Sequence, residues 1–426
     1  MPGARLRDSL VVYSSDVTCA AIGFVSLILV SRTLGPEGYG VFSIAIALMG
    51  IAFQISDLGL SGGTTRFAAP LALGNRNKYL RTIRASLQLR AAASVAVFGG
   101  GFAASILLSS LLFGRNSEIL VVILAFAGGL ATSFFAHVRV VLQSERRFVS
   151  LATARVAVAV TTLVLLTVLI TFKNLNDNSS VATYVIAPLS AFVIFSMFRR
   201  DRLAEKDLRE ERTGLLRFSK WIFVVAMLSA VFLKLDVFFL GATWTDRDVG
   251  LYSVAITLIY PVTQLANSLS TVLMPEVSSF KTKRALTRFM RGSFTYTVPI
   301  SIALIVFALS PLPPDLIRLF FGSDYIEATD PFRVLSITGA AWLISTPLLL
   351  GVYPINRPKV LAQGDLIKLI LHVVAYSILV APFGIMGAAW GSALALGSGS
   401  VIAVALVFRA VRESEEIFPE ESAIVR

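Results

Sequence analysis

Ionisable side chains inside long apolar stretches are the residues of this sequence that can carry chemistry. Charged groups are expensive in hydrocarbon, so those within membrane segments usually face a water-filled cavity or one another. Here basic residues outweigh acidic ones at such places, which favours an anionic ligand over a cationic one. The candidates are Asp16, Arg139, Arg155, Lys220, Lys234, Asp236, Asp365, Lys368 and His372.

Three basic residues form a predicted cationic group near the inner mouth of a cavity. Arg139 and Arg155 fall at the cytoplasmic ends of consecutive apolar segments, and Lys220 begins another. Guanidinium groups suit bidentate contact with phosphate. For Arg155 and Lys220 the alternative is that their long side chains reach toward the headgroup interface.

Two charged residues lie close together in a later segment. Lys234 and Asp236 are two residues apart, so on one continuous helix they point about 160° from each other and cannot both face one lumen. Lys234 is the ligand-binding candidate, and Asp236 is expected to pair with a neighbouring helix. Asp16 has three interpretations: a cation or proton site, a salt-bridge partner, or a residue solvated at the membrane rim.

Asp365, Lys368 and His372 follow the spacing i, i+3, i+7, which places them on one helix face. Three ionisable groups on one face predict that this face lines water. The alternative for His372 is a hydrogen-bonded histidine without a functional role.

The composition identifies an integral membrane protein. Apolar residues make up 56%, charged residues 15%, and the mean hydropathy is +0.78, which no soluble surface of this size accommodates. The net charge of +12 comes from basic residues between apolar segments rather than from an aromatic-interleaved patch, so no nucleic-acid partner is predicted. One cysteine and two histidines predict neither a disulfide within the chain nor a metal centre, and no cofactor is expected.

Apolar runs of about 20 residues, the length that crosses a hydrocarbon core, predict twelve transmembrane helices. The first is interpreted as a retained span rather than a cleaved signal. They lie near 10–31, 39–58, 87–112, 119–142, 150–172, 181–198, 219–241, 250–272, 293–312, 332–353, 361–382 and 385–408.

Loop charges give the orientation, because Lys and Arg concentrate on the cytoplasmic side. With both termini inside, most basic loop residues fall on inner segments, and the outer segments carry Arg32, Arg115, Lys173, Arg247 and Arg318, with Arg333 at a span edge. The predicted domains are a six-helix bundle at 1–198, a charged cytoplasmic linker at 199–217, a second six-helix bundle at 218–408 and a cytoplasmic tail at 409–426.

A repeated phrase supports two equivalent halves. Residues 40–48 and 250–258 share Gly, Ser, Ala, Ile and Leu at the same places, and each phrase opens a long apolar segment. Because each half has an even number of spans, we expect parallel bundles related by an axis along the membrane normal. The charges do not repeat: Asp16 corresponds to Ala226, and Lys234 corresponds to Phe24.

Several motifs carry a family resemblance. Arg32-Thr-Leu-Gly-Pro-Glu-Gly-Tyr-Gly-Val-Phe-Ser, Asp57-Leu-Gly-Leu with Arg66, Val249-Gly-Leu-Tyr-Ser-Val-Ala and Leu273-Met-Pro-Glu-Val-Ser resemble the polysaccharide transporter family, the O-antigen type flippases. The resemblance implies an all-α, MATE-like transporter fold in the plasma or inner membrane. It also implies alternating-access translocation of a polyprenyl-diphosphate-linked oligosaccharide from the inner to the outer leaflet, without enzymatic chemistry.

Two alternatives remain at this point: a cation-coupled multidrug exporter of the same superfamily, and a membrane-embedded polysaccharide polymerase. The sequence has no phosphate-binding Gly-Lys loop, so a transporter would draw on an ion gradient, with Na⁺ or H⁺ as the coupled ion, on the membrane potential or on the substrate gradient. Membrane lipids are expected partners. The transporter is expected to be monomeric, with association with polysaccharide-assembly proteins left open.

Overall fold

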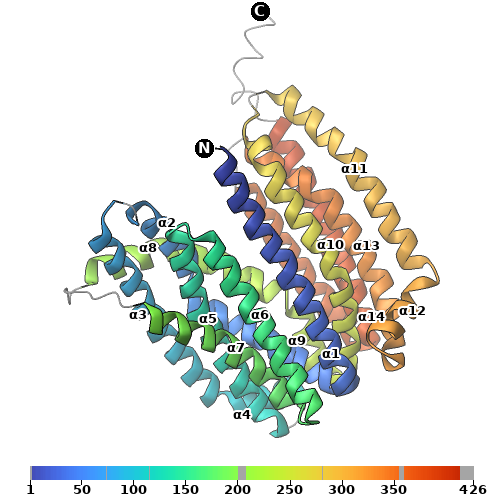
Figure 1. The fold of residues 1–426 in the computed structure, drawn as a ribbon. Coiled ribbons are helices and arrows are strands. Elements are labelled where there is room, and N and C mark those ends of the chain that lie inside the picture. The colour runs from blue at the N-terminus through green and yellow to red at the C-terminus, as the bar shows by residue number, and fades with distance from the viewer. Residues whose placement is uncertain are drawn as a thin grey trace, which may run out of the picture. The chain divides into compact units, whose positions relative to one another are not determined.

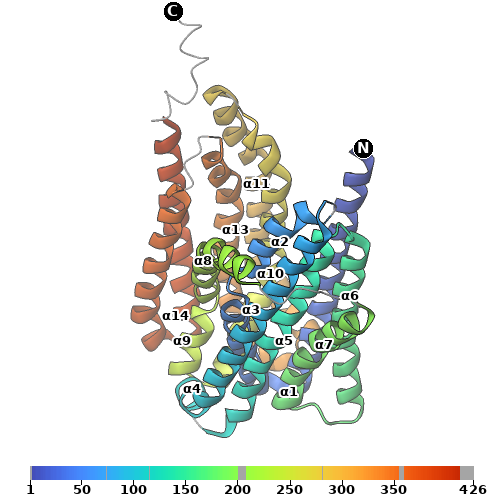
Figure 2. The same cartoon turned by 90° about the vertical axis from the view of Figure 1, so that its left-hand side faces the viewer.

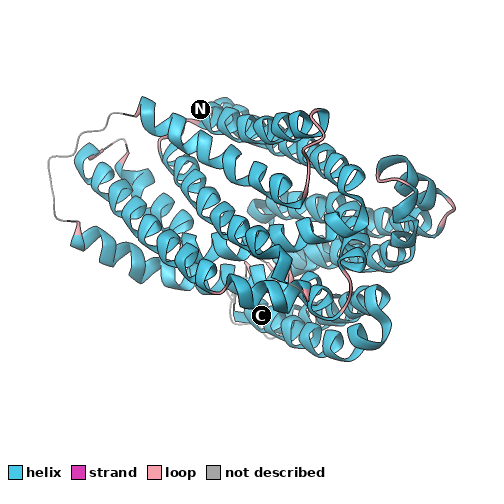
Figure 3. Ribbon diagram, turned by 90° about the horizontal axis from the view of Figure 1, so that it is seen from below, coloured by secondary structure: helices cyan, strands magenta, loops and turns pink. Residues whose placement is uncertain are grey.

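The computed structural model describes residues 2–72, 74–114, 116–199, 208–280, 282–354 and 359–412. Within these ranges all regular elements are helices joined by short loops, as Figure 3 shows. Residues 200–207 of the predicted linker and 413–426 of the predicted tail lie outside the described ranges, as do Arg115 and Arg357.

Fourteen α-helices and three short 3-10 helices follow one another along the described chain (Figure 1). Their bounds are α1 Pro2–Asp57, α2 Leu60–Leu71, α3 Arg76–Ala103, α4 Ser105–Phe113, η1 Asn116–Glu118, α5 Ile119–Ser144, α6 Phe148–Thr171, α7 Asp177–Phe198, α8 Arg209–Phe232, α9 Leu235–Thr243, α10 Asp246–Ser278, α11 Lys283–Leu309, α12 Leu312–Phe320, η2 Ser323–Ala328, α13 Thr329–Leu349, η3 Leu350–Val352 and α14 Lys359–Arg412.

Two of these helices are too long to be single membrane crossings. α1 has 56 residues and α14 has 54, whereas about 20 residues cross a hydrocarbon core. Each is broken by a glycine with positive φ, Gly35 at 69° and Gly384 at 55°. Both helices therefore consist of two segments joined at a kink.

The two segments of α14 fold back on each other. Gly391 lies against the ring of Tyr376, and Gly399 lies against the stem of Lys368, so closely that a Cβ at either glycine would collide with its neighbour. Residues so far apart in sequence cannot touch along one straight helix. The chain therefore reverses at Gly384, in agreement with the tight turn predicted between residues 382 and 385.

Within the described ranges nine helical segments are long and apolar enough to cross a membrane, or ten when the bent pair α3 and α4 counts as one crossing. Dividing α1 and α14 at their kinks as well reproduces the twelve predicted places, but the exact number of crossings stays a prediction. The predicted span 87–112 is not one straight helix, because α3 and α4 meet at 63°. The predicted span 219–241 is likewise interrupted, between Phe232 and Leu235.

The described chain forms two compact units, Met1–Arg247 and Asp248–Arg426. α8 and α9 pack with the first unit, and Figure 2 shows α8 beside α2 and α3. Residues 209–217 of the predicted linker are helical, and Leu215 is buried in a cluster with Leu60 and Ala85. The six-plus-six division of the chain stays a prediction.

The repeated phrase occupies the buried interior of each unit. In the first copy Val41, Phe42 and Ile44 are buried in α1, and in the second copy Leu251 and Tyr252 are buried in α10. Burial of large apolar side chains dominates packing energetics, at about 25 cal/mol per Å². The sequence similarity between the halves thus falls on residues that build the core.

A buried ion pair joins four elements of unit 1. Arg90 on α3 is 0% exposed, and its guanidinium lies 2.5 Å from the Asp57 carboxylate at the end of α1. The same guanidinium donates to Ser61 Oγ on α2 at 3.0 Å and to the Ser133 carbonyl on α5 at 3.2 Å. Ser61 also donates its backbone N–H and its hydroxyl to Asp57.

A second ionic cluster ties α3, α5 and the end of α7 together at the end of unit 1 predicted to be cytoplasmic. The Glu145 carboxylate accepts from Tyr79 Oη at 3.0 Å, from Arg199 at 3.0 Å and from Arg76 at 3.3 Å. Burial, reinforced by the Glu145 charge, raises the pKa of Tyr79 to about 12, so the phenol remains a donor at neutral pH.

We expect Arg90→Met or Asp57→Leu alone to destabilise unit 1 by about 3–5 kcal/mol, because each leaves a buried charge without its counterion. The double variant Arg90→Met/Asp57→Leu is expected to be more stable than either single variant. Thermal unfolding of the purified variants measures this order. Additive losses in the double variant would show that the pair is not coupled.

We expect Glu145→Gln to lower the unfolding temperature, because one carboxylate at the end of α5 holds two donors on α3 and one at the end of α7, and the free-energy loss should be about 1–3 kcal/mol. Glu210→Gln, on an exposed position of α8, is the matched control and should leave the unfolding temperature unchanged. If both variants unfold at the same temperature, the cluster does not stabilise unit 1.

Candidate functional site

Unit 1 holds three arginines and two aspartates in one neighbourhood, of which Arg90 and Asp57 are buried and the other three are half-buried. Arg155 on α6 forms an ion pair with Asp16 on α1, and Arg90 pairs with Asp57. Arg139 on α5 lies within electrostatic range of Arg155, Arg90 and Asp57. The predicted neighbourhood of Arg139 and Arg155 is therefore present, and these five residues together carry a net positive charge.

Arg139 differs from the other two arginines in its contacts. Its guanidinium lies over the Phe135 ring, 5.8 Å from the centroid. Among the described residues it has no carboxylate or hydrogen-bond partner, and its Nε is buried. An unpaired guanidinium offers five N–H donors in a fixed fork, the geometry that binds phosphate oxygens.

His137 precedes Arg139 by two residues on α5 and is buried. Its Nδ1 has no hydrogen-bond partner within the described part of the chain. Arg90 and Arg199 contribute positive potential at its ring. A second polar side chain therefore accompanies Arg139 in the interior of unit 1.

Lys220 does not join this group. It is exposed on α8, and its ammonium lies 5.5 Å from the ring centroid of the neighbouring Trp221, which is also exposed. A Lys beside an exposed Trp is typical of residues at a membrane interface. The exposure of Lys220 therefore favours the alternative in which its side chain reaches toward the headgroup interface, rather than a cationic group with Arg139 and Arg155.

Lys234 and Asp236 sit at a helix break, which corrects the expected angle between them. α8 ends at Phe232 and α9 begins at Leu235, so Lys234 lies in the turn and the spacing of one continuous helix does not apply. Lys234 is half-buried. Asp236 is buried in the first turn of α9, and its Oδ1 accepts from the Val237 N–H at 2.8 Å, where a carboxylate interacts favourably with the helix dipole.

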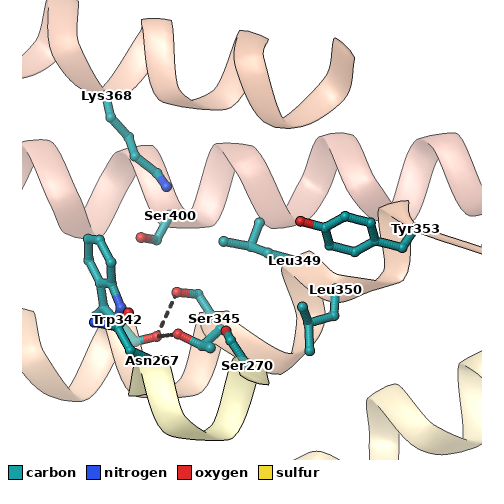
Figure 4. Close-up of a pocket in the computed structure, with 10 residues that line it drawn as sticks. Asn267, Ser270, Trp342, Ser345, Leu349, Leu350, Tyr353, Lys368 and Ser400 are labelled. Carbon is teal, nitrogen blue, oxygen red and sulfur yellow. Dashed lines mark hydrogen bonds between the residues drawn. The ribbon is translucent and has the colours of Figure 1, made fainter. Parts of the chain in front are cut away.

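The three residues predicted to share one face of a helix have different surroundings in unit 2. Lys368 and His372 are buried, whereas the Asp365 side chain is 74% exposed. His372 packs on Tyr376, with ring centroids 4.3 Å apart. Of the three residues, Lys368 lines a cavity of about 170 Å³, shown in Figure 4.

That cavity is built by α10, α13 and α14. Asn267 and Ser270 come from α10, and Trp342 and Ser345 come from α13. Ser400 on the second segment of α14 lies opposite Lys368 on the first. These four polar side chains and that of Lys368 are thus positioned by helices of unit 2, and Tyr353 joins the wall from the turn after η3.

Arg90 is a buried charge that the sequence analysis did not single out, although it lies inside the predicted span 87–112. The available signal was an arginine near the start of an apolar run, together with Asp57 in the preceding motif.

For metals, the described residues contain no group of three or more His, Cys, Asp or Glu side chains arranged to hold an ion.

Comparisons with known proteins agree on the kind of protein. Residues 29–330 match the family described as polysaccharide biosynthesis protein. The probable low-salt glycan biosynthesis flippase Agl15 of Haloferax volcanii is 21% identical over 417 residues, which covers 93% of this chain and 82% of the relative. The putative O-antigen transporter of Shigella flexneri is 20% identical over 383 residues, covering 86% and 89%.

Solved structures share the fold. The lipid II flippase MurJ in an inward closed conformation superposes with a TM-score of 0.75 at 14% identity, covering 96% of this chain and 90% of that one. An inward-facing multidrug resistance MATE family transporter of the MOP superfamily gives 0.72 at 15% identity, covering 93% and 96%. The predicted all-α, MATE-like membrane fold is confirmed, and since the family match spans most of its length, this multi-pass membrane protein belongs to the polysaccharide biosynthesis protein family.

Proposed function

We propose that this protein is a flippase that moves a polyprenyl-diphosphate-linked oligosaccharide from the inner to the outer leaflet of the cell membrane. The family, the names of the relatives and the MurJ-like fold support a lipid-linked glycan as the substrate. Translocation makes and breaks no covalent bond, so the proposed role is transport rather than catalysis. The same comparisons favour this role over a polysaccharide polymerase.

The observation that carries the proposal is that Arg139 has no carboxylate partner among the described residues. A diphosphate needs cationic donors in an otherwise apolar unit, and a guanidinium already neutralised by a carboxylate is a weaker ligand for it. Arg90 and Arg155 are paired with Asp57 and Asp16, whereas Arg139 has no such partner among the described residues. It is therefore the proposed diphosphate contact, with Lys234 as a second cationic candidate.

A cation-coupled multidrug exporter is the second candidate, favoured by the similarity to MATE transporter structures. Such a protein needs carboxylates that are available to a cation. In unit 1 the carboxylates of Asp16 and Asp57 are already held by Arg155 and Arg90. These contacts support the anionic substrate over the cationic one.

For the transport cycle, we propose twelve spans in two parallel six-helix bundles, both termini in the cytoplasm, and alternating access driven by a Na⁺ or H⁺ gradient, the membrane potential or the substrate gradient. The protein is proposed to act as a monomer in the plasma or inner membrane.

We expect Arg139→Gln to lower the flipping rate by about ten-fold or more, since a charge-assisted hydrogen bond contributes about 1.5–3 kcal/mol. Lys234→Ala should lower it as well. The assay reconstitutes the protein into liposomes with a labelled lipid-linked oligosaccharide and measures exposure of the label to an impermeant reagent. Arg217→Gln, exposed on α8, is the control, and wild-type rates for both Arg139→Gln and Lys234→Ala would reject the cationic site.

We expect Asp16→Arg and Arg155→Asp to impair flipping singly, because each leaves two like charges facing each other across α1 and α6. The exchanged double variant should recover much of the rate, since it restores an opposite pair in the same place. Rates are measured in the same liposome assay. If Asp16 instead binds the coupling ion, the double variant stays inactive.

A further inference from the structure

The cavity around Lys368 has the construction of a small ligand site. Its volume of about 170 Å³ is below the roughly 300–1,000 Å³ of sites for drug-sized ligands. Gly399 provides room for the lysine stem, because a side chain there would collide with Lys368 Cγ. The geometry thus places one buried ammonium at the wall of a compartment suited to a single ring.

The charge of Lys368 is only weakly compensated by the protein. The residue is 6% exposed. Its Nζ lies 3.3 Å from Asp365 Oδ1, but that carboxylate is largely exposed, and ion pairs with exposed groups contribute little. The Trp342 ring, 5.8 Å from Nζ, adds a cation–π attraction. An ammonium has three N–H donors, so donors remain for a ligand in the cavity.

The rest of the wall is uncharged and combines polar groups with the apolar side chains of Leu349 and Leu350. Asn267, Ser345 and Ser400 contribute amide and hydroxyl groups. Ser345 donates its hydroxyl to the Trp342 carbonyl at 3.0 Å, which leaves its oxygen lone pairs to accept from a ligand hydroxyl. Several neutral donors and acceptors around a small volume match the hydroxyl groups of a sugar.

We propose that this cavity binds one sugar ring that carries a carboxylate, with the carboxylate on Lys368 Nζ and the ring hydroxyls on Asn267, Ser345 and Ser400. A carboxylate brings one negative charge to one ammonium. A phosphate monoester brings about −1.5 to −2, of which part would stay uncompensated in a buried site. The proposal rests on the proposed function, since it makes an acidic sugar part of the translocated glycan.

The test uses Trp342 as its own reporter. Trp221→Phe, Trp244→Phe and Trp390→Phe leave Trp342 as the single tryptophan of the chain. The full-length protein in phosphatidylcholine nanodiscs, which avoid sugar-headed detergents, is titrated with methyl glucuronoside, methyl glucoside and glucose 1-phosphate. We expect the glucuronoside to bind about ten-fold or more tightly than the other two. Equal affinities, tighter binding of the phosphate, or no Trp342 response would overturn the proposal.

Two variants in the same background test the role of the ammonium. Lys368→Met should remove the preference for the acidic sugar. Asp365→Asn, at an exposed position that tolerates substitution, should strengthen glucuronoside binding several-fold without changing glucoside binding, because it removes a competing carboxylate. Arg288→Gln, exposed on α11, should change neither. Unchanged glucuronoside affinity in Asp365→Asn contradicts the site even if Lys368→Met fails to fold.

Flipping of lipid-linked glycans is measured in parallel to separate the two proposals. If the protein flips such lipids but its Trp342 site does not select the acidic sugar, the site is wrong and the proposed function stands. If it flips none of them, the proposed function fails independently of the titration.

Discussion

Charge in an apolar unit must be paired, and the Arg90–Asp57 contact is where unit 1 meets this requirement most completely. Removing ions from water costs several kcal/mol each, which is offset only when geometry and additional hydrogen bonds are good. Here Ser61 and the Ser133 carbonyl supply those hydrogen bonds. Because the four groups come from α1, α2, α3 and α5, satisfying one guanidinium fixes the mutual positions of four helices.

The same requirement makes an unpaired charge informative. Arg155 has Asp16, and Glu145 collects Arg76 and Arg199. Among the described residues Arg139 has no such counterpart, and the carboxylate that pairs with Lys368 is mostly exposed. Charges retained at this cost without a good internal partner are explained best by a partner from outside, which is why both proposals rest on these two residues.

The fold was largely predictable because hydropathy and loop charge are local properties of the sequence. The helix break at Leu233–Lys234 was not, since no proline or glycine marks a kink there, and packing decides where the helix turns. The ion pairs of Arg90 with Asp57 and of Arg155 with Asp16 could not be predicted, for a related reason. Spacing rules describe neighbours on one helix, whereas these ion pairs join different helices.

The case of Asp365, Lys368 and His372 shows what periodicity can and cannot predict. Their spacing does place them on one side of α14, yet their environments differ. Asp365 is exposed, Lys368 lines a cavity and His372 packs on an aromatic ring. Sequence spacing predicts only the direction in which a side chain points from its helix. The environment of that side chain depends on which neighbouring helix packs against it.

The internal repeat shows the same difference between apolar packing and charged positions. Equivalent residues of the two copies, such as Phe42 and Tyr252, are buried and build each unit by apolar packing, which tolerates little change in volume. Charged positions outside that packing are free to diverge, so the arginines of unit 1 have no requirement to recur in unit 2. A duplicated scaffold can in this way hold two different polar sites, one suited to a diphosphate and one to a single acidic ring. A substrate with two chemically distinct anionic parts is the kind of molecule for which such an asymmetry is useful.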